Sequence, residues 1–227
     1  MKKPICIGNW KSNKTVEESK TWIREFSSLL SKIPPGNLPT IIVCPPFTAL
    51  MTVKEMIDEH TIPIHLAAQD ISPFMEGSFT GEVSADMVKE LASYVLVGHA
   101  ERRNYFKETE EELFFETLQA HKSELSTVFC VPDGTSEVPD IADMIAYEPV
   151  SSIGSGIPED ARTASEVCLS IFKKTGKPVL YGGSVDEKSI RDFINAPGIS
   201  GVLVGKASLD PIQFFHLIEL VTDFSET

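Results

Sequence analysis

In this chain of 227 residues an imidazole and a carboxylate each follow directly after an apolar run. His99 follows the run Tyr94–Gly98, and Glu148 follows the run Asp143–Tyr147. A neutral imidazole can donate a hydrogen bond to a carbonyl oxygen, and a carboxylate in a dry pocket can remove a proton from carbon. The two residue types therefore predict chemistry that moves protons, provided that the fold brings them together.

Other polar or glycine-rich residues also stand just after apolar runs. Asn9 and Lys11 follow the first run, the segment 182–184 (Gly-Gly-Ser) follows the seventh, and Gly205 follows the eighth. In a barrel of parallel strands, all the carboxyl ends meet at one face, and this face carries the chemistry. The spacing therefore predicts a single site built from several strand ends.

The elements that must position these residues are short β-branched runs that alternate with helical patterns. The expected strands are Pro4–Gly8, Thr40–Cys44, Ile62–Ala67, Tyr94–Gly98, Thr127–Val131, Asp143–Tyr147, Pro178–Tyr181 and Gly201–Val204. Repeated βα units imply a parallel sheet, and eight strands can close into a barrel. An open doubly wound sheet is the structural alternative, but it needs a glycine-rich phosphate turn after its first strand, which this chain lacks.

Several connections carry signals for the start of a helix. Thr15 with Glu18, and Thr109 with Glu112, have the spacing of capping boxes. Pro158 and Pro211 suit the first turn of a helix, the latter behind Asp210.

The interval between Cys130 and Glu148 is different, because prolines and an Asp-Gly pair leave room for only a loop or one turn. We therefore expect an α/β protein, a (β/α)8 barrel whose fifth helix is shortened or missing. No linker or low-complexity stretch divides the chain, so residues 1–227 are expected to form one domain.

The charge balance restricts the classes of partner. Twenty basic residues against 33 acidic ones give a net charge of −13, which argues against nucleic acid and against anionic membranes. No run reaches the roughly 18 apolar residues of a membrane span. A phosphorylated ligand is still compatible, since salt screens charges beyond about 8 Å and a small basic pocket can persist on an acidic protein.

Four cysteines stand far apart in the sequence, mostly within apolar runs: Cys6, Cys44, Cys130 and Cys168. This pattern favours buried thiols over disulfides or metal ligands, and it suggests a cytoplasmic setting.

With these segments in order, the chain resembles the triosephosphate isomerase family over almost its whole length. The matching motifs are NWK (9–11), CPP (44–46), AQD (68–70), FTGE (79–82), GHAERR (98–103), YEPV (147–150), YGGSV (181–185) and LVG (203–205). The resemblance implies an aldose-ketose isomerase of glycolysis and gluconeogenesis that interconverts dihydroxyacetone phosphate and D-glyceraldehyde 3-phosphate through an enediolate. It implies neither a cofactor nor a catalytic metal.

The resemblance also implies roles for particular residues. Glu148 looks like the general base, His99 like the neutral group that polarises the substrate carbonyl, and Lys11 like the cation beside the enediolate and the phosphate. Asn9 donates a hydrogen bond to the same oxygens. Glu101 looks like a supporting carboxylate near Lys11 and His99, although a salt bridge to one of the following arginines is an alternative role. Backbone N–H groups of four residues are expected to bind phosphate: Gly154, Ser184, Gly205 and Lys206.

The chain departs from the family pattern at four places. In the lid Pro149–Gly156, Ser151 and Ser152 replace the usual Trp and Ala of a hinge. Lys206 stands where a second glycine is usual, and Ala100 stands in place of a serine. We expect activity with a somewhat raised Michaelis constant.

Assembly is expected to be at least a homodimer. The segment Asp70–Glu82 carries Phe74, Met75 and Phe79, which a monomer would expose. The resemblance implies that Thr80 of this segment reaches the neighbouring active site. A tetramer through Phe114 and Phe115 is the alternative assembly.

Two other functions compete with the isomerase. A different barrel enzyme acting on a sugar or indole phosphate would keep only the phosphate site, and a non-catalytic barrel would have lost one of the four polar residues Asn9, Lys11, His99 and Glu148. All four are present.

Overall fold

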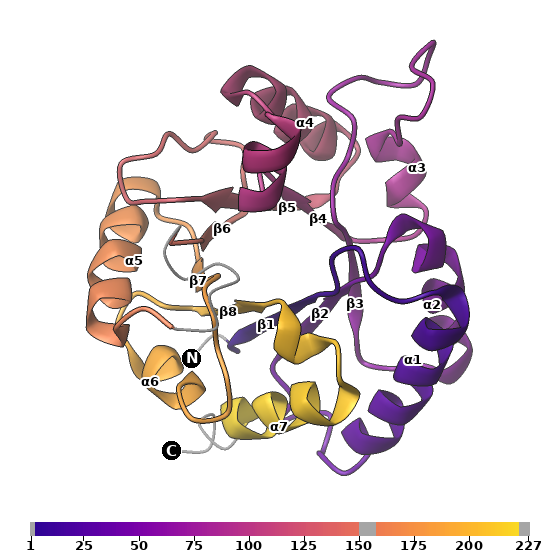
Figure 1. Ribbon diagram of the computed structural model, residues 1–227, viewed down its shortest axis with the longest axis vertical. Helices are drawn as coiled ribbons and strands as arrows, with labels where there is room; N and C mark the ends of the chain where they lie inside the picture. The colour runs from indigo at the N-terminus through magenta and orange to yellow at the C-terminus, as the bar shows by residue number, and fades with distance from the viewer. Residues whose placement is uncertain (1–2, 150–157, 223–227) are drawn as a thin grey trace.

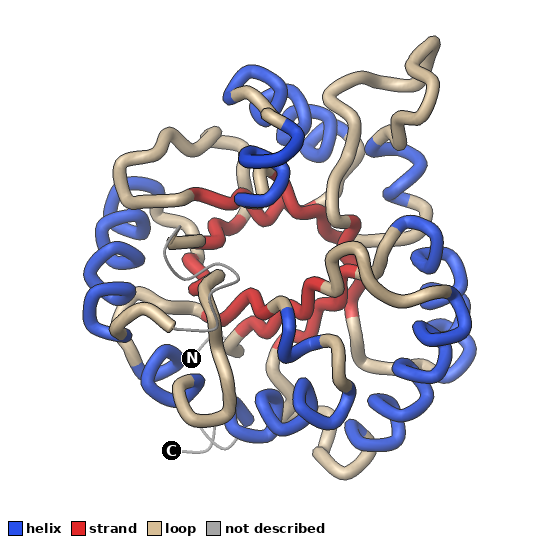
Figure 2. Tube along the Cα trace, viewed as in Figure 1, coloured by secondary structure: helices blue, strands red, loops and turns tan. Residues whose placement is uncertain are grey.

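A computed structural model describes residues 3–149 and 158–222. Its eight parallel strands form a closed barrel in sequence order, and β8 pairs with β1. Figure 2 shows the ring of strands at the centre and the helices around it. The strands are β1 (Ile5–Asn9), β2 (Thr40–Cys44), β3 (His65–Ala68), β4 (Tyr94–Val97), β5 (Ser126–Val131), β6 (Met144–Tyr147), β7 (Val179–Tyr181) and β8 (Gly201–Val204). The predicted (β/α)8 barrel is confirmed.

Helices cover the outside of the barrel (Figure 1). They are α1 (Val16–Leu30), α2 (Phe47–His60), α3 (Ala85–Lys89), a π-helical turn η1 (Arg102–Phe106), α4 (Glu110–Lys122), α5 (Ala161–Thr175), α6 (Ile190–Asn195), a 3-10 turn η2 (Lys206–Ser208) and α7 (Pro211–Thr222). Within the described residues, no helix is long and apolar enough to cross a membrane.

Both predicted capping boxes are present. The side chains of Thr15 and Thr109 accept the backbone N–H three residues on, and the glutamates there accept the threonine N–H in return. Pro211 opens α7 as predicted. The prediction for Pro158 is wrong: α5 begins at Ala161, because Asp160 caps it by accepting two N–H groups of its first turn.

The connection from β5 to β6 contains no helix, as the sequence predicts. Polar contacts hold this loop instead. Asp143 accepts the backbone N–H of Thr127 at 2.8 Å, and the hydroxyl of Thr127 accepts the N–H of Asp143 at 3.0 Å. Lys177 binds the carbonyl of Asp140 at 2.8 Å.

The core has two layers. One layer contains strand residues alone, such as Ile7, Leu96 and Leu180, and therefore fills the inside of the barrel. The other packs the outer strand residues against the helices. The four cysteines are buried and free, as predicted, and burial raises the pKa of the Cys6 thiol to about 12. Thiols of this kind are inert packing groups.

Candidate active site

A cavity of about 580 Å³ lies at the carboxyl ends of the strands. It collects most of the site residues that the sequence predicts from separate strand ends: Asn9, Lys11, His99, Glu148, Ser184, Gly205 and Lys206. Gly154 and the lid positions Ser151 and Ser152 lie outside the described residues. The predicted meeting of strand ends thus occurs at one cavity.

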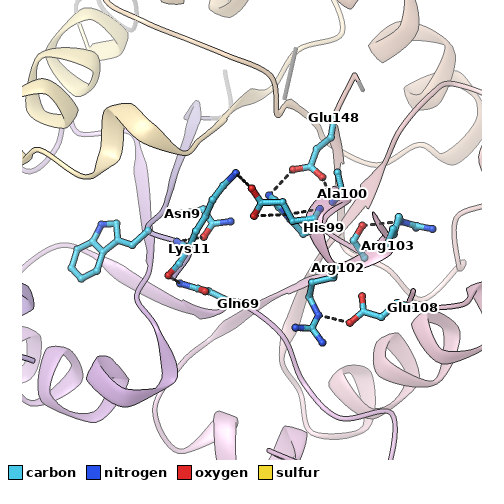
Figure 3. A network of polar contacts seen from close by, with 12 residues as sticks. Asn9, Lys11, Gln69, His99, Ala100, Arg102, Arg103, Glu108 and Glu148 are labelled. Carbon is cyan, nitrogen blue, oxygen red and sulfur yellow. Dashed lines mark hydrogen bonds and ion pairs between the residues drawn. The ribbon is translucent and has the colours of Figure 1, made fainter. Parts of the chain in front are cut away.

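His99 and Glu148 contact each other directly at the base of this site (Figure 3). His99 Nε2 lies 3.1 Å from Glu148 Oε1, and the two residues are 6% and 2% exposed. The backbone N–H of Ala100 donates to Glu148 Oε2 at 2.8 Å. Each carboxylate oxygen therefore has a hydrogen-bond partner, and the carboxylate is almost fully buried.

The hydrogen bond at the other imidazole nitrogen, Nδ1, indicates which tautomer His99 adopts. The backbone N–H of Glu101 donates to His99 Nδ1 at 3.2 Å, so Nδ1 carries a lone pair and no proton. The other ring nitrogen, Nε2, then carries the proton and faces Glu148. A neutral ring with Nε2–H toward the cavity is the form that polarises a carbonyl without transferring a full charge.

Lys11 extends into the cavity from the turn after β1. Its Nζ lies 2.6 Å from Glu101 Oε1, and its backbone has a φ of 53°, which is rare for a residue with a side chain. Asn9 Oδ1 accepts the N–H of Lys11 at 2.9 Å, and Gln69 donates to the Lys11 carbonyl at 2.9 Å. These bonds hold the strained turn and aim the ammonium group (Figure 3).

Glu101 contacts Lys11 and forms no ion pair with Arg102 or Arg103 among the described residues. The arginines that follow it bind other groups: Arg102 pairs with Asp70 and Glu108, and Arg103 pairs with Glu110. Glu101 therefore lies beside the cavity residues Lys11 and His99.

Two glycines near the site leave space that a side chain would fill. A Cβ at Gly98 would lie 2.9 Å from the guanidinium of Arg103, and its φ of 71° is left-handed. A Cβ at Gly182 would lie 2.8 Å from Glu148 Cγ and 3.1 Å from the carbonyl of Tyr147. Gly182 thus lets the carboxylate of Glu148 occupy its position, a role that only the folded arrangement reveals.

The cavity carries its positive charge locally. Both Lys11 and Lys206 line it, and the latter is solvent-exposed. A Cβ at Gly205 would lie 3.2 Å from Lys11 Cε, so this glycine keeps space beside the ammonium group. Two lysines therefore stand at this cavity although the whole protein is acidic.

Sequence reasoning missed some features of the site. It treated Ala100 only as the loss of a hydroxyl, whereas its backbone N–H binds Glu148. Trp10 and Gln213 also line the cavity. No local signal marks such residues, because their place in the site depends on contacts between distant segments.

Known proteins match this chain over most of its length. The family model for triosephosphate isomerase matches residues 4–221. A triosephosphate isomerase from Mesomycoplasma hyopneumoniae (strain 7448) is 38% identical over 245 aligned positions, which cover 95% of this chain and 98% of the relative. Another from Dictyoglomus turgidum is 34% identical, covering 96% and 99%. The crystal structure of triosephosphate isomerase from Bartonella henselae superposes with a TM-score of 0.81 at 25% identity, covering 96% and 98%.

Proposed function

Because the chain belongs to the triosephosphate isomerase family, we propose that the cavity at the carboxyl end of its barrel is where it interconverts dihydroxyacetone phosphate and D-glyceraldehyde 3-phosphate. The observation that carries this assignment is the contact between His99 Nε2 and Glu148 Oε1 beside the ammonium of Lys11. A coupled assay with glyceraldehyde 3-phosphate measures the activity, and substitutions at these residues test their roles.

In the proposed reaction Glu148 is the base. It takes a proton from C1 of the ketose, and the electron pair of that C–H bond forms the C1–C2 double bond while O2 becomes anionic. His99 Nε2–H and the Lys11 ammonium stabilise this oxygen. The hydroxyl proton moves from O1 to O2 through His99, and Glu148 then returns its proton to C2, which leaves an aldehyde at C1.

Substrate binding must change the contact between the two catalytic groups. At 3.1 Å, Nε2 and the carboxylate leave no room for a carbonyl oxygen between them. The substrate oxygen therefore takes the Nε2–H from Glu148, and the freed carboxylate turns toward the carbon. The N–H of Ala100 can hold the other carboxylate oxygen meanwhile.

The phosphate end is proposed to bind near Ser184, Gly205 and Lys206, which line the same cavity as the catalytic pair. The expected donor from the lid, Gly154, completes this set in the proposal. Exposed backbone N–H groups next to glycine suit an anion, and Lys206 adds positive charge close to it.

Gly182→Ala tests whether the space beside Glu148 matters. The added methyl group meets Glu148 Cγ and the Tyr147 carbonyl, so the carboxylate has to move away from its position. We expect kcat to fall by about tenfold or more, because small displacements of a catalytic group reduce the rate strongly. The matched control is Gly36→Ala, since nothing lies within 4 Å of a Cβ there. Equal kcat values for the two variants would contradict the role of Gly182.

The proposed assembly is a homodimer formed through residues 70–82, with residues 1–227 of each chain as one catalytic domain. Phe74, Met75 and Phe79 of this loop are 47%, 63% and 41% exposed, and the rings of Phe74 and Phe79 stack at 4.2 Å. The loop projects from the barrel between β3 and α3 (Figure 1). A preformed apolar projection of this kind suits a second copy, and Thr80 is proposed to reach its cavity. The four free cysteines support a cytoplasmic setting.

Phe79→Glu tests the dimer. A charge in the apolar loop should shift the sedimentation coefficient toward the monomer and lower activity together with it. Phe172→Glu is the control, because Phe172 is similarly exposed at 47% but lies on α5, on the opposite side of the barrel in Figure 1. A wild-type monomer with full activity in sedimentation experiments would refute the dimer, and a tetramer would point to the exposed pair Phe114 and Phe115.

A further inference from the structure

Three carboxylates gather outside the catalytic cavity, between the loop after β3 and helix α4. They form the acidic cluster, which consists of Asp70, Glu108 and Glu116. Asp70 follows β3, Glu108 precedes α4 and Glu116 lies within that helix. One oxygen from each carboxylate lies within 4.8 Å of the other two.

The carboxylates of the acidic cluster outnumber the positive groups that pair with them. Arg102 binds Asp70 Oδ2 at 2.7 Å, and its Nε binds Glu108 Oε1 (Figure 3 shows the contact with Glu108). One guanidinium thus pairs with two of the three carboxylates, Asp70 and Glu108. Glu82 and Glu112 add further negative potential, and the nearby Arg103 is already paired with Glu110. With all three carboxyls ionised, the cluster and Arg102 together carry two uncompensated negative charges.

Glu116 is the most buried member of the acidic cluster, and one of its oxygens has no hydrogen-bond partner among the described residues. The residue is only 2% exposed, and the unpaired oxygen is Oε2. Asp70 Oδ1 and Glu108 Oε2 are likewise buried and unpaired there. Burial, followed by the neighbouring carboxylates, raises the pKa of Glu116 to about 9 and contributes to a pKa of about 7 for Asp70. Without a cation such carboxyls keep their protons, and a bound cation would replace these protons.

We propose that the acidic cluster binds one divalent cation, and that Ca²⁺ fits it best. Carboxylate oxygens are hard donors of the kind that Ca²⁺ and Mg²⁺ prefer. Two oxygens on opposite sides of Ca²⁺, with bonds of about 2.3–2.6 Å, stand roughly 4.6–5.2 Å apart, which accommodates the separations in the cluster. Mg²⁺ has shorter bonds and gives up its water reluctantly, so the buried Glu116 suits it less well.

A bound cation would join the three segments that carry the cluster, in addition to the ion pairs of Arg102. Gln119 of α4 donates to the Pro73 carbonyl at 3.4 Å, a long hydrogen bond. The cation would join the start of the 70–82 loop to α4, and through Arg102 to the turn that follows His99. The site is therefore structural, and it is distinct from the chemistry at Glu148.

Titration of the metal alone tests this proposal. The full chain is freed of metal with a chelator, dialysed, and titrated with CaCl₂ in a calorimeter. We expect one Ca²⁺ per chain and a rise in the unfolding midpoint of about 5 °C at saturation, compared with NaCl of equal ionic strength. Binding of MgCl₂ should be weaker, and tighter binding of Mg²⁺ would overturn the assignment to Ca²⁺.

Two variants on the same helix separate the site from general charge effects. Glu116→Gln keeps the size of the side chain but removes its charge, so Ca²⁺ affinity should fall at least about tenfold and most of the thermal shift should disappear. Glu111→Gln is the control, since Glu111 is exposed on α4 away from the cluster, and it should bind as the wild type does. If wild type binds no Ca²⁺, or if Glu116→Gln binds it equally well, the proposal fails.

Discussion

Replacing Glu148 by glutamine should lower kcat by about 10²-fold or more, because the variant has no carboxylate to accept the proton from carbon. The side chain keeps nearly the same shape in a position that is 2% exposed, so the fold should tolerate it. One contact does change. Glu148 accepts from both the Ala100 N–H and His99 Nε2–H, whereas an amide offers only one acceptor oxygen.

Binding and exchange measurements distinguish the loss of the base from a general disturbance of the site. Glycerol 3-phosphate carries the phosphate but no carbonyl, and its affinity should change little in Glu148→Gln because the phosphate contacts remain. Exchange of the C1 hydrogen of dihydroxyacetone phosphate with deuterated water should fall together with kcat. Glu148→Asp restores a carboxylate at a greater distance and should recover part of both rates. Wild-type exchange in the glutamine variant would eliminate Glu148 as the base.

The positions of the proposed catalytic residues follow from local sequence patterns to a large extent. Every predicted strand overlaps an observed one, and β2 and β8 agree at both ends. The β-branched runs are short and bounded by polar or turn residues, so the tertiary structure has little reason to override them. His99 and Glu148 then come together because parallel strands in a closed barrel present their carboxyl ends at one face.

The sequence predicts a helix start correctly where the residue that caps the helix is itself identified. Thr15 and Thr109 cap through residues three positions on, and both predictions hold. Pro158 failed because Asp160, two residues later, accepts the N–H groups of Arg162 and Thr163 and fixes the helix start there. A proline permits a first turn, but a capping carboxylate determines it.

The acidic cluster could not have been predicted from the sequence. Asp70 and Glu116 are 46 positions apart in the chain, and the sequence pattern around Glu116 reads as an ordinary acidic helix. Only the packing of α4 against the loop after β3 places Glu116 among the other two carboxylates. Side chains that act through long-range packing carry no local signal, which is equally true of Gly182 beside Glu148.

Lys11→Ala should weaken both binding and turnover, with a loss in kcat/KM of about 10³-fold. The ammonium group attracts the phosphate of the bound substrate as well as the oxygen that becomes anionic, so KM should rise while kcat falls. Alanine keeps a Cβ, and the φ of 53° is therefore equally strained in both proteins. The variant thus changes the side chain and leaves the turn after β1 in place.

Part of the loss in kcat/KM of Lys11→Ala should arise because Glu101 loses its ion-pair partner. Its carboxylate lies 2.6 Å from Lys11 Nζ, and without the lysine it faces the anionic substrate unpaired. Glu101→Gln in the Lys11→Ala background should therefore recover some of the KM effect, while the kcat effect persists. A double-mutant cycle on steady-state kinetics measures this coupling. If Lys11→Ala leaves KM unchanged, the ammonium group acts only in the transition state, and the proposed contact with the phosphate is wrong.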